Sequence, residues 1–308
     1  MATSASFGDE NQGFQIANNY GPINAQFQPP RERPQPGIFI PFSKNPNFVD
    51  RGDILDRIAK KFNHHHTRVA LVGFGGAGKS QLAIEYARRL HKAQESDGKQ
   101  KWIFWVDSST QATFERGFRA IAGHVELPGR EDPKANILEL VRDWLSYKCT
   151  EGWTLVIDNA DDYDMFYDKS SGVTNLRLAQ YLPQSDNGSI LVTTRDMRLA
   201  RDLTGHNPDH LFEIGSMARA ESLTLLRSKL KPPPKPETAE SLVAELGDIP
   251  LAIVQAAAYI QTHRPLYSPE QYLDDFREKS EKVKLLQHDA PDLYRGYEHP
   301  SLGSQAFG

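Results

Sequence analysis

Residues 73–80 have the types and spacing of a phosphate-binding loop. They read Gly-Phe-Gly-Gly-Ala-Gly-Lys-Ser, which fits the pattern G-x-x-x-x-G-K-S/T, between the apolar run 68–72 and the amphipathic run 81–90. The glycines let backbone N–H groups turn onto an anion, and the following helix adds the positive end of its dipole. We therefore expect Lys79 to reach the β- and γ-phosphates and Ser80 to bind Mg²⁺. The alternative is an ordinary strand-to-helix turn that is rich in glycine.

A second metal ligand is expected at Asp158, which ends the buried apolar run 153–157. Mg²⁺ prefers oxygen ligands and keeps several waters, so one hydroxyl and one carboxylate are enough protein ligands. An apolar run that ends in aspartate also caps helices and turns, and only the loop upstream favours the metal role. The next residue, Asn159, cannot accept a proton. Asp161 and Asp162 are each either a substitute base or part of a solvated acidic turn.

Two more residues are expected to face a bound nucleotide. Arg195 follows the apolar run 189–193, where a guanidinium suits the γ-phosphate and distinguishes ATP from ADP. The alternative is a surface arginine paired with Asp196. Pro250 begins the very apolar segment 251–258; by itself it marks only a helix start, and the family resemblance given below implies that its ring lies against adenine. Together with Lys79 and Asp158, Arg195 completes the expected catalytic set.

These residues need a sheet to bring them together. β-rich apolar runs predict strands at 68–72, 101–106, 153–157 and 189–193, and helical spacing predicts helices at 53–62, 81–90, 111–125 and 134–147. Strands that alternate with helices pair in parallel through crossovers, which predicts an α/β fold with a parallel P-loop NTPase sheet flanked by helices. Ligands of such sheets bind beyond the carboxyl ends of the strands, the edge where Gly73, Asp158 and Arg195 are expected.

Past residue 211 the pattern is helical. Helices are predicted at 221–230, 240–246, 251–263 and 268–279, with a proline-rich loop at 231–236. The expected organisation is a disordered N-terminal arm (1–28), a proline-rich linker (29–46), a nucleotide-binding domain (47–214), a small helical subdomain (215–291) and a disordered tail (292–308).

Composition narrows the class of protein. The 308 residues have a formal net charge of −4, which gives no electrostatic reason to expect a nucleic-acid partner. The single cysteine, Cys149, excludes an intrachain disulfide framework and is expected to pack rather than react. No segment reads as a secretory signal or a membrane span, so we expect a cytoplasmic protein.

The order of the motifs resembles the NB-ARC group of STAND nucleotide switches. Residues 48–55 look like its adenine-binding segment, 73–80 its Walker A, 155–158 its Walker B, 190–195 its sensor strand, 211–215 with Glu221 its link to the helical subdomain, and 247–252 its G-L-P-L-A element. This resemblance implies ADP or ATP with Mg²⁺, held by Ser80 and Asp158. The implied nucleotide-binding residues are Phe48, Val49, Gly73, Gly75, Gly76, Ala77, Gly78, Lys79, Ser80, Gln81, Arg195 and Pro250.

Two departures from that family bear on mechanism. The family often has a second aspartate where this chain has Asn159, which puts fast hydrolysis in doubt. The family's winged-helix domain and repeat sensor would follow the helical subdomain, and the sequence ends before them. Autoinhibition and ligand sensing are therefore not assumed.

The N-terminal arm resembles the short sigma-type amyloid motif of fungal incompatibility and immune receptors. Residues 8–16 and 19–27 each alternate apolar with amide side chains, a pattern that buries one face of a cross-β stack and ladders Asn and Gln on the other. Residue chemistry alone favours a disordered tail, and the resemblance reverses that preference.

The resemblance implies a switch that ADP holds closed and ATP opens. Homo-oligomerisation would then bring the arms together and recruit an effector with a matching amyloid motif. Two alternatives remain: a small P-loop ATPase or kinase that is an enzyme in its own right, and a scaffold with permanently bound ADP.

Overall fold

The computed structural model describes residues 34–62, 67–98, 100–168 and 175–289. The chain divides into two units, residues 1–35 and 36–308, and all the helices and strands named below belong to the second. The predicted arm (1–28) and tail (292–308) lie outside the described residues.

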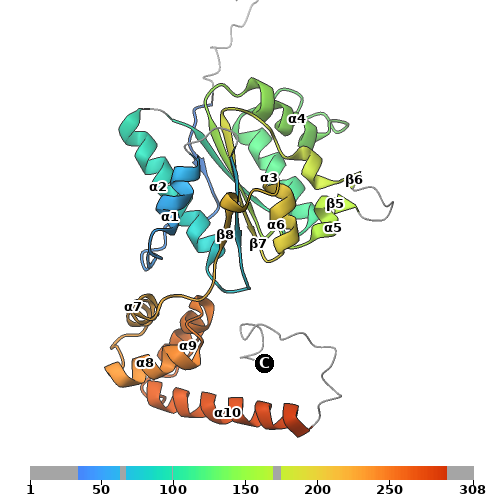
Figure 1. Ribbon diagram of the computed structural model, residues 1–308. Coiled ribbons are helices and arrows are strands. Elements are labelled where there is room, and N and C mark those ends of the chain that lie inside the picture. Colours follow the sequence, from blue (N-terminus) through green and yellow to red (C-terminus); the bar gives the residue numbers. More distant parts are fainter. Residues whose placement is uncertain (1–33, 63–66, 99, 169–174, 290–308) are drawn as a thin grey trace, which may run out of the picture. The chain divides into compact units, whose positions relative to one another are not determined.

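A six-stranded sheet forms the centre of the first part (Figure 1). Its order is β1-β3-β4-β7-β2-β8, and every neighbouring pair is parallel. The strands are β1 (Ile38–Phe39), β2 (Arg68–Val72), β3 (Trp102–Asp107), β4 (Trp153–Asp158), β7 (Gly188–Thr194) and β8 (Leu211–Glu213). All six residues of β4 are buried, as expected for the centre of a sheet covered on both faces. The predicted parallel α/β sheet is confirmed.

Helices cover both faces of the sheet (Figure 1). One face packs against α1 (Ile54–Phe62) and α2 (Lys79–Asp97). The other packs against α3 (Gln111–His124), α4 (Ile137–Asp143) and α6 (Met197–Leu203), and these helices share the largest core with the sheet. Predicted helix 134–147 is shorter than expected, because α4 passes into a π-helical turn, η1 (Trp144–Lys148).

Short elements complete this part of the chain. They are α5 (Tyr163–Phe166), the antiparallel pair β5 (Tyr167–Asp168) and β6 (Asn175–Leu176), and the 3₁₀ turns η2 (Leu178–Tyr181) and η3 (Pro208–His210). None was predicted. Each is two to four residues long, too short to show a period in the sequence.

The remaining helices form a group with a core of its own. They are α7 (Arg219–Lys229), α8 (Pro236–Glu245), α9 (Pro250–Thr262) and α10 (Pro269–Asp289). Pro236 and Pro250 stand in the first turns of α8 and α9, where the missing N–H has no cost. The predicted helical subdomain is confirmed as four helices. Across the described helices, none has both the length and the hydropathy needed to cross a membrane.

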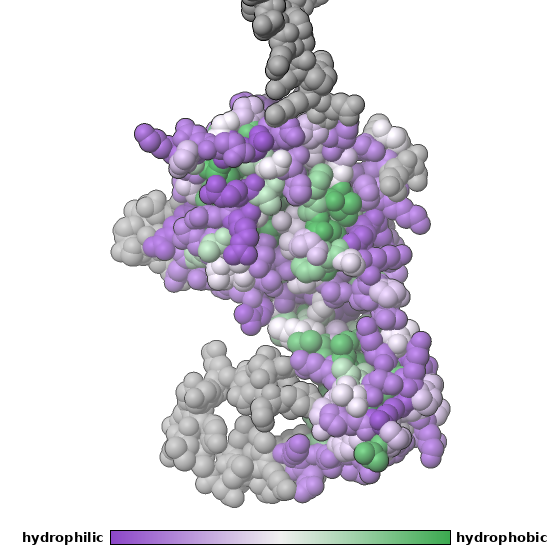
Figure 2. Space-filling model, turned by 180° about the vertical axis from the view of Figure 1, so that it is seen from behind, coloured by the Kyte–Doolittle hydropathy of each residue, from purple (hydrophilic) through white to green (hydrophobic). Residues whose placement is uncertain are grey.

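The surface of the molecule is mainly polar. Figure 2 shows a face on which hydrophilic residues predominate and hydrophobic residues gather in smaller patches. Large apolar side chains that are well exposed include Phe42, Phe74 and Leu251. Isolated exposed apolar residues are ordinary for a folded protein, but Phe74 lies in the phosphate-binding loop and Leu251 in the segment 247–252.

The predicted linker contributes to the sheet. Residues 38–39 add a parallel strand beside β3, and the Phe39 ring stacks on those of Trp102 and Phe104. Further along, Phe42 meets Trp105 edge to face, and its carbonyl accepts a hydrogen bond from Arg88. Proline content predicts stiffness; it does not reveal the aromatic side chains of a neighbouring strand to which the segment docks.

Candidate functional site

The phosphate-binding loop joins the end of β2 to the start of α2. Gly76 and Gly78 have φ of 85° and 93°, backbone conformations that L side chains rarely adopt. At Gly73 a Cβ atom would lie 2.1 Å from the Ile214 carbonyl oxygen, so only glycine fits beside the residue that follows β8. The α2 helix begins at Lys79 and directs its positive dipole end at the loop.

Lys79 supplies the cation of the loop. Its ammonium group donates to the carbonyls of Gly73 and Phe74 at 2.7 and 2.9 Å. Burial lowers the pKa of Lys79, and the Asp161 carboxylate opposes that shift. The ammonium is therefore held over the loop, where the phosphate chain of a nucleotide would lie.

The two predicted metal ligands lie in contact. Asp158 is 4% exposed, and its Oδ1 accepts hydrogen bonds from Ser80 Oγ at 2.7 Å and from the Thr193 hydroxyl. Its Oδ2 accepts from Asn159 Nδ2 at 3.2 Å. Burial raises the pKa of the Asp158 carboxyl, against the hydrogen bonds from Thr193 and Ser80.

This oxygen pair fits Mg²⁺ better than a metal that needs a protein cage. Within the described ranges no group of three His, Cys, Asp or Glu side chains is placed to hold a metal. Mg²⁺ binds through one or two protein oxygens plus phosphate and water, so a hydroxyl and a carboxylate suffice. Ser80 and Asp158 would hold the ion, which would neutralise phosphate charge when bound.

The acidic residues after β4 are each engaged. Asp161 Oδ2 accepts from Arg195 Nε at 2.6 Å, and its Oδ1 accepts from the Arg195 backbone N–H at 2.7 Å. Asp162 caps α5 by accepting from two backbone N–H groups. Asp196, the other candidate partner of Arg195, instead caps α6 by accepting from Leu199 N at 2.9 Å. Arg195 is therefore paired, but with Asp161.

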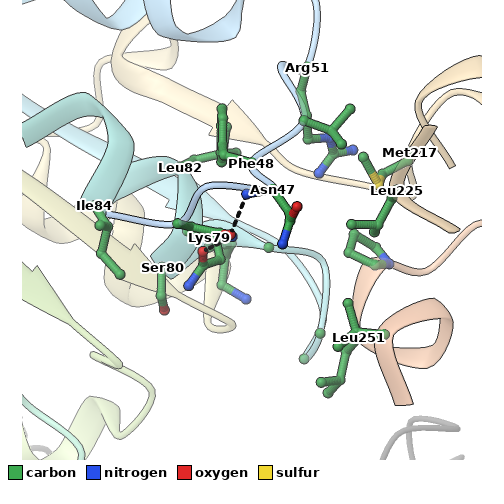
Figure 3. A pocket seen from close by; sticks show the side chains of 18 of the residues that line it. Asn47, Phe48, Arg51, Lys79, Ser80, Leu82, Ile84, Met217, Leu225 and Leu251 are labelled. Atoms are coloured by element: carbon green, nitrogen blue, oxygen red, sulfur yellow. Dashed lines mark hydrogen bonds between the residues drawn. The ribbon is translucent and has the colours of Figure 1, made fainter. Parts of the chain in front are cut away.

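A pocket of about 750 Å³ lies over the loop (Figure 3). Predicted residues that line it are Phe48, Val49, Gly75, Gly76, Gly78, Lys79, Ser80, Gln81, Arg195 and Pro250. Gly73, Ala77 and Asp158 are not among its lining residues; Ala77 and Asp158 are buried, and Asp158 accepts from the Ser80 hydroxyl that lines the pocket. The volume is that of a typical small-molecule site.

Several lining residues were not predicted. Phe42, Ser43 and Asn45 come from the expected linker, and Asn47 directly follows it. Arg51, Leu82, Ile84, Asn159, Asp161, Met217, Leu225, Lys229, Leu251 and Val254 complete the wall. Figure 3 shows Met217, Leu225 and Leu251 across the pocket from Lys79 and Ser80. No sequence signal marks the apolar helical residues, because they read as ordinary core positions. An amide-rich stretch just before Phe48 is the one hint the linker offered.

Two contacts join the helical residues to the loop. The Leu251 backbone N–H donates to the Gly76 carbonyl at 3.3 Å. The Arg51 side chain donates to the carbonyls of Ala77 (2.7 Å), Gly215 (2.9 Å) and Ser216 (2.7 Å), and its Nε lies 3.8 Å from Glu221. The loop, the β8–α7 connection and α7 thus share one guanidinium.

Comparison with known proteins adds family information. Residues 51–234 match the model of the NB-ARC domain, and residues 3–25 match that of the SesB domain on fungal death-pathway protein. A Hyaloscypha variabilis protein described as "Nucleotide-binding leucine-rich repeat (NLR)-like protein" is 32% identical over 281 residues. The match covers 86% of this chain and 28% of that protein, so the chain spans little more than a quarter of this relative's length.

Solved structures of low sequence identity share the fold. The Aeropyrum pernix ORC2 protein, in its ADPNP-ADP complexes, superposes with a TM-score of 0.54 at 15% identity, over 76% of this chain and 71% of that one. A chain of the HORMA:CdnC:Trip13 complex of E. coli MS115-1 gives a TM-score of 0.52 at 14% identity, over 75% and 89%.

Proposed function

The chain belongs to the NB-ARC family of STAND-class P-loop NTPases, and on that premise we propose that it is the ADP/ATP-controlled switch of a fungal NLR-like signalling receptor that acts in the cytoplasm. A SesB motif at residues 3–25 precedes the switch. We propose further that the chain exchanges nucleotide together with Mg²⁺, oligomerises and signals through the arm.

One observation carries the proposal: a single pocket draws its walls from three segments that are far apart in the sequence. The P-loop supplies Lys79, the segment after the arm supplies Asn45 and Asn47, and the helical group supplies Met217 and Leu225. A nucleotide in this pocket would touch all three. A ligand shifts an arrangement only through contacts that differ between two states, and a diphosphate and a triphosphate differ at this loop.

The segment after the arm is held to the P-loop helix by side-chain contacts. Asn45 Nδ2 donates to Gln81 Oε1 at 2.9 Å, and Gln81 directly follows the metal-binding Ser80. A nucleotide that contacts Gln81 would therefore affect its hydrogen bond with Asn45, in the segment that leads to the arm. This connection supports a coupling between bound nucleotide and arm.

Hydrolysis is expected to be slow. Asn159 occupies the position where a second aspartate would act, Asp161 is bonded to Arg195, and Asp162 caps a helix. A general base must be free to accept a proton from the attacking water. With these three groups unavailable, ATP turnover would act as a reset of the switch rather than as its output.

The arm would act after assembly. Oligomers of the switch would raise the local concentration of the tethered SesB segments, which favours pairing without any new contact. The partner that this chemistry implies is an effector with a matching amyloid motif. Thioflavin fluorescence of the full chain should rise with ATP and Mg²⁺ but not with ADP; an equal response to both nucleotides would contradict nucleotide-controlled signalling.

The nucleotide released from the purified chain tests the core of the proposal. We expect ADP, slow phosphate release, and loss of binding in Lys79→Arg, whose bulkier guanidinium cannot take the place of the ammonium between the loop carbonyls. Lys148→Arg, exposed at the end of η1, is the matched control and should bind normally. Rapid phosphate release would favour the independent ATPase or kinase, and ADP that never exchanges would favour the scaffold. Unchanged binding by Lys79→Arg would refute the assigned site.

A further inference from the structure

The contact between Asp161 and Arg195 is more specific than a surface ion pair. One carboxylate holds both the backbone and the side chain of the same arginine, at 2.7 and 2.6 Å. The bond to the backbone N–H fixes the main chain of Arg195 relative to the carboxylate, and the bond to Nε orients the guanidinium. An exposed pair with a single contact would leave that direction free.

The free end of the guanidinium is the end that suits phosphate. Asp161 accepts from the Nε of Arg195, and among the described residues no hydrogen bond engages the two terminal nitrogens of this arginine. Both residues line the pocket with Lys79, and the Arg195 side chain is 60% exposed. Two terminal N–H groups in one plane match two oxygens of a phosphate.

Asp161 itself is held in place by the sheet. The backbone N–H groups of Asn159 and Ala160 donate to the hydroxyl and the carbonyl of Thr193, at 3.0 and 2.9 Å. The Thr194 hydroxyl in turn donates to the Ala160 carbonyl. Hydrogen bonds thus join the loop after β4 to the end of β7. The Asp161 side chain is only 25% exposed. These contacts exceed what a solvated acidic turn requires.

We propose that Asp161 is the positioning residue of the nucleotide sensor: it holds Arg195 so that the terminal nitrogens face the γ-phosphate, and thereby sets the preference for triphosphate over diphosphate. This inference rests on the proposed function of the same pocket. Asp161 acts through Arg195 and touches no reacting atom.

Charge alone predicts the opposite effect, which makes the proposal testable. A carboxylate beside the phosphates repels a triphosphate more strongly than a diphosphate, because the triphosphate carries more negative charge. Removing the charge would then favour the triphosphate. If Asp161 instead orients Arg195, removing it must favour the diphosphate.

The experiment compares Asp161→Asn with the wild-type chain by calorimetric titration with ADP and with ATPγS, each with Mg²⁺. Asn keeps an oxygen for the Arg195 backbone N–H but cannot accept from both donors as the carboxylate does. We expect the ATPγS affinity to fall at least about fivefold relative to the ADP affinity. Asp209→Asn removes a carboxylate from the exposed pair with Lys61, 3.4 Å apart, and should leave the ratio unchanged.

A double-mutant cycle separates positioning from loss of structure. In an Arg195→Lys background, which keeps the charge but not the planar fork, adding Asp161→Asn should no longer shift the ratio toward the diphosphate. An unchanged ratio in the single variant, a shift toward the triphosphate, or additive effects in the cycle would overturn the inference. If the wild type binds neither nucleotide, the proposed function fails first. Retained ADP binding by Asp161→Asn shows that the variant is folded.

Discussion

Arg51 is the side chain whose loss should most clearly uncouple the sheet from the helical group. Its side chain is 9% exposed and donates to the carbonyls of Ala77, Gly215 and Ser216. Hydrogen bonds from a charged donor contribute about 1.5 kcal/mol or more each, but water can replace the arginine at the two exposed residues, 215 and 216. We expect Arg51→Ala to lower the free energy of unfolding by about 3 kcal/mol, roughly a hundredfold in the unfolding constant.

The tryptophans provide an assay that separates the two parts. All four, Trp102, Trp105, Trp144 and Trp153, lie in the sheet part of the chain, so their fluorescence reports only that part. Far-UV ellipticity also reports α7–α10. In urea titrations, the two signals should coincide for the wild type, and in Arg51→Ala ellipticity should fall before fluorescence. Arg119→Ala, exposed on α3, is the control and should shift neither midpoint.

The variant Arg51→Lys sharpens the test. A lysine keeps the positive charge, but its single ammonium group cannot span carbonyls that the arginine fork reaches together, so we expect an intermediate loss. A change below about 0.5 kcal/mol in Arg51→Ala, with coincident signals, would show that the loop and the helical group are joined mainly by other contacts.

Burial leads to three further predictions. The raised pKa of Asp158 means that the folded state binds the carboxyl proton more tightly than the unfolded chain, so the contribution of this group to stability is lost as pH rises through that pKa. In urea titrations near pH 7 without nucleotide, Asp158→Asn should therefore be more stable than the wild type. The same variant should lose the Mg²⁺-dependent tightening of ATP binding. At Gly188 an added Cβ would lie 2.0 Å from the Trp153 ring, so Gly188→Ala should lower the free energy of unfolding by more than about 2 kcal/mol. Gly123→Ala, which has open space on α3, should raise it by about 0.5 kcal/mol in the same titrations. Burial raises the pKa of Cys149 to about 12, so mass spectrometry should detect no alkylation by iodoacetamide until the chain unfolds.

Local chemistry was enough to identify the phosphate loop and the sheet. The spacing of residues 73–80 and the four apolar runs predicted β2, β3, β4 and β7 within one or two residues. Each signal is contained in a short stretch, because strand and loop preferences depend on near neighbours in the sequence. The edge that brings Lys79, Asp158 and Arg195 together follows from parallel pairing alone.

The pairing of acidic side chains could not be read from the sequence. Asp161, Asp162 and Asp196 have the same side chain, and all three lie close to the predicted strand ends. Which one meets Arg195 depends on how the loop after β4 is bonded to the end of β7. Those contacts join residues that are about thirty positions apart, beyond the reach of any local pattern.

The sequence by itself determined the family and the phosphate loop, and it singled out Ser80 and Asp158, which the fold brings into contact, because glycine conformation and side-chain chemistry act locally. The tertiary structure alone decided that Phe42, Ser43, Asn45 and Asn47 line the pocket over the loop, and that Arg51 bonds the loop to the β8–α7 connection. A wall built from distant segments depends on how the chain packs, and packing is a property of the whole fold.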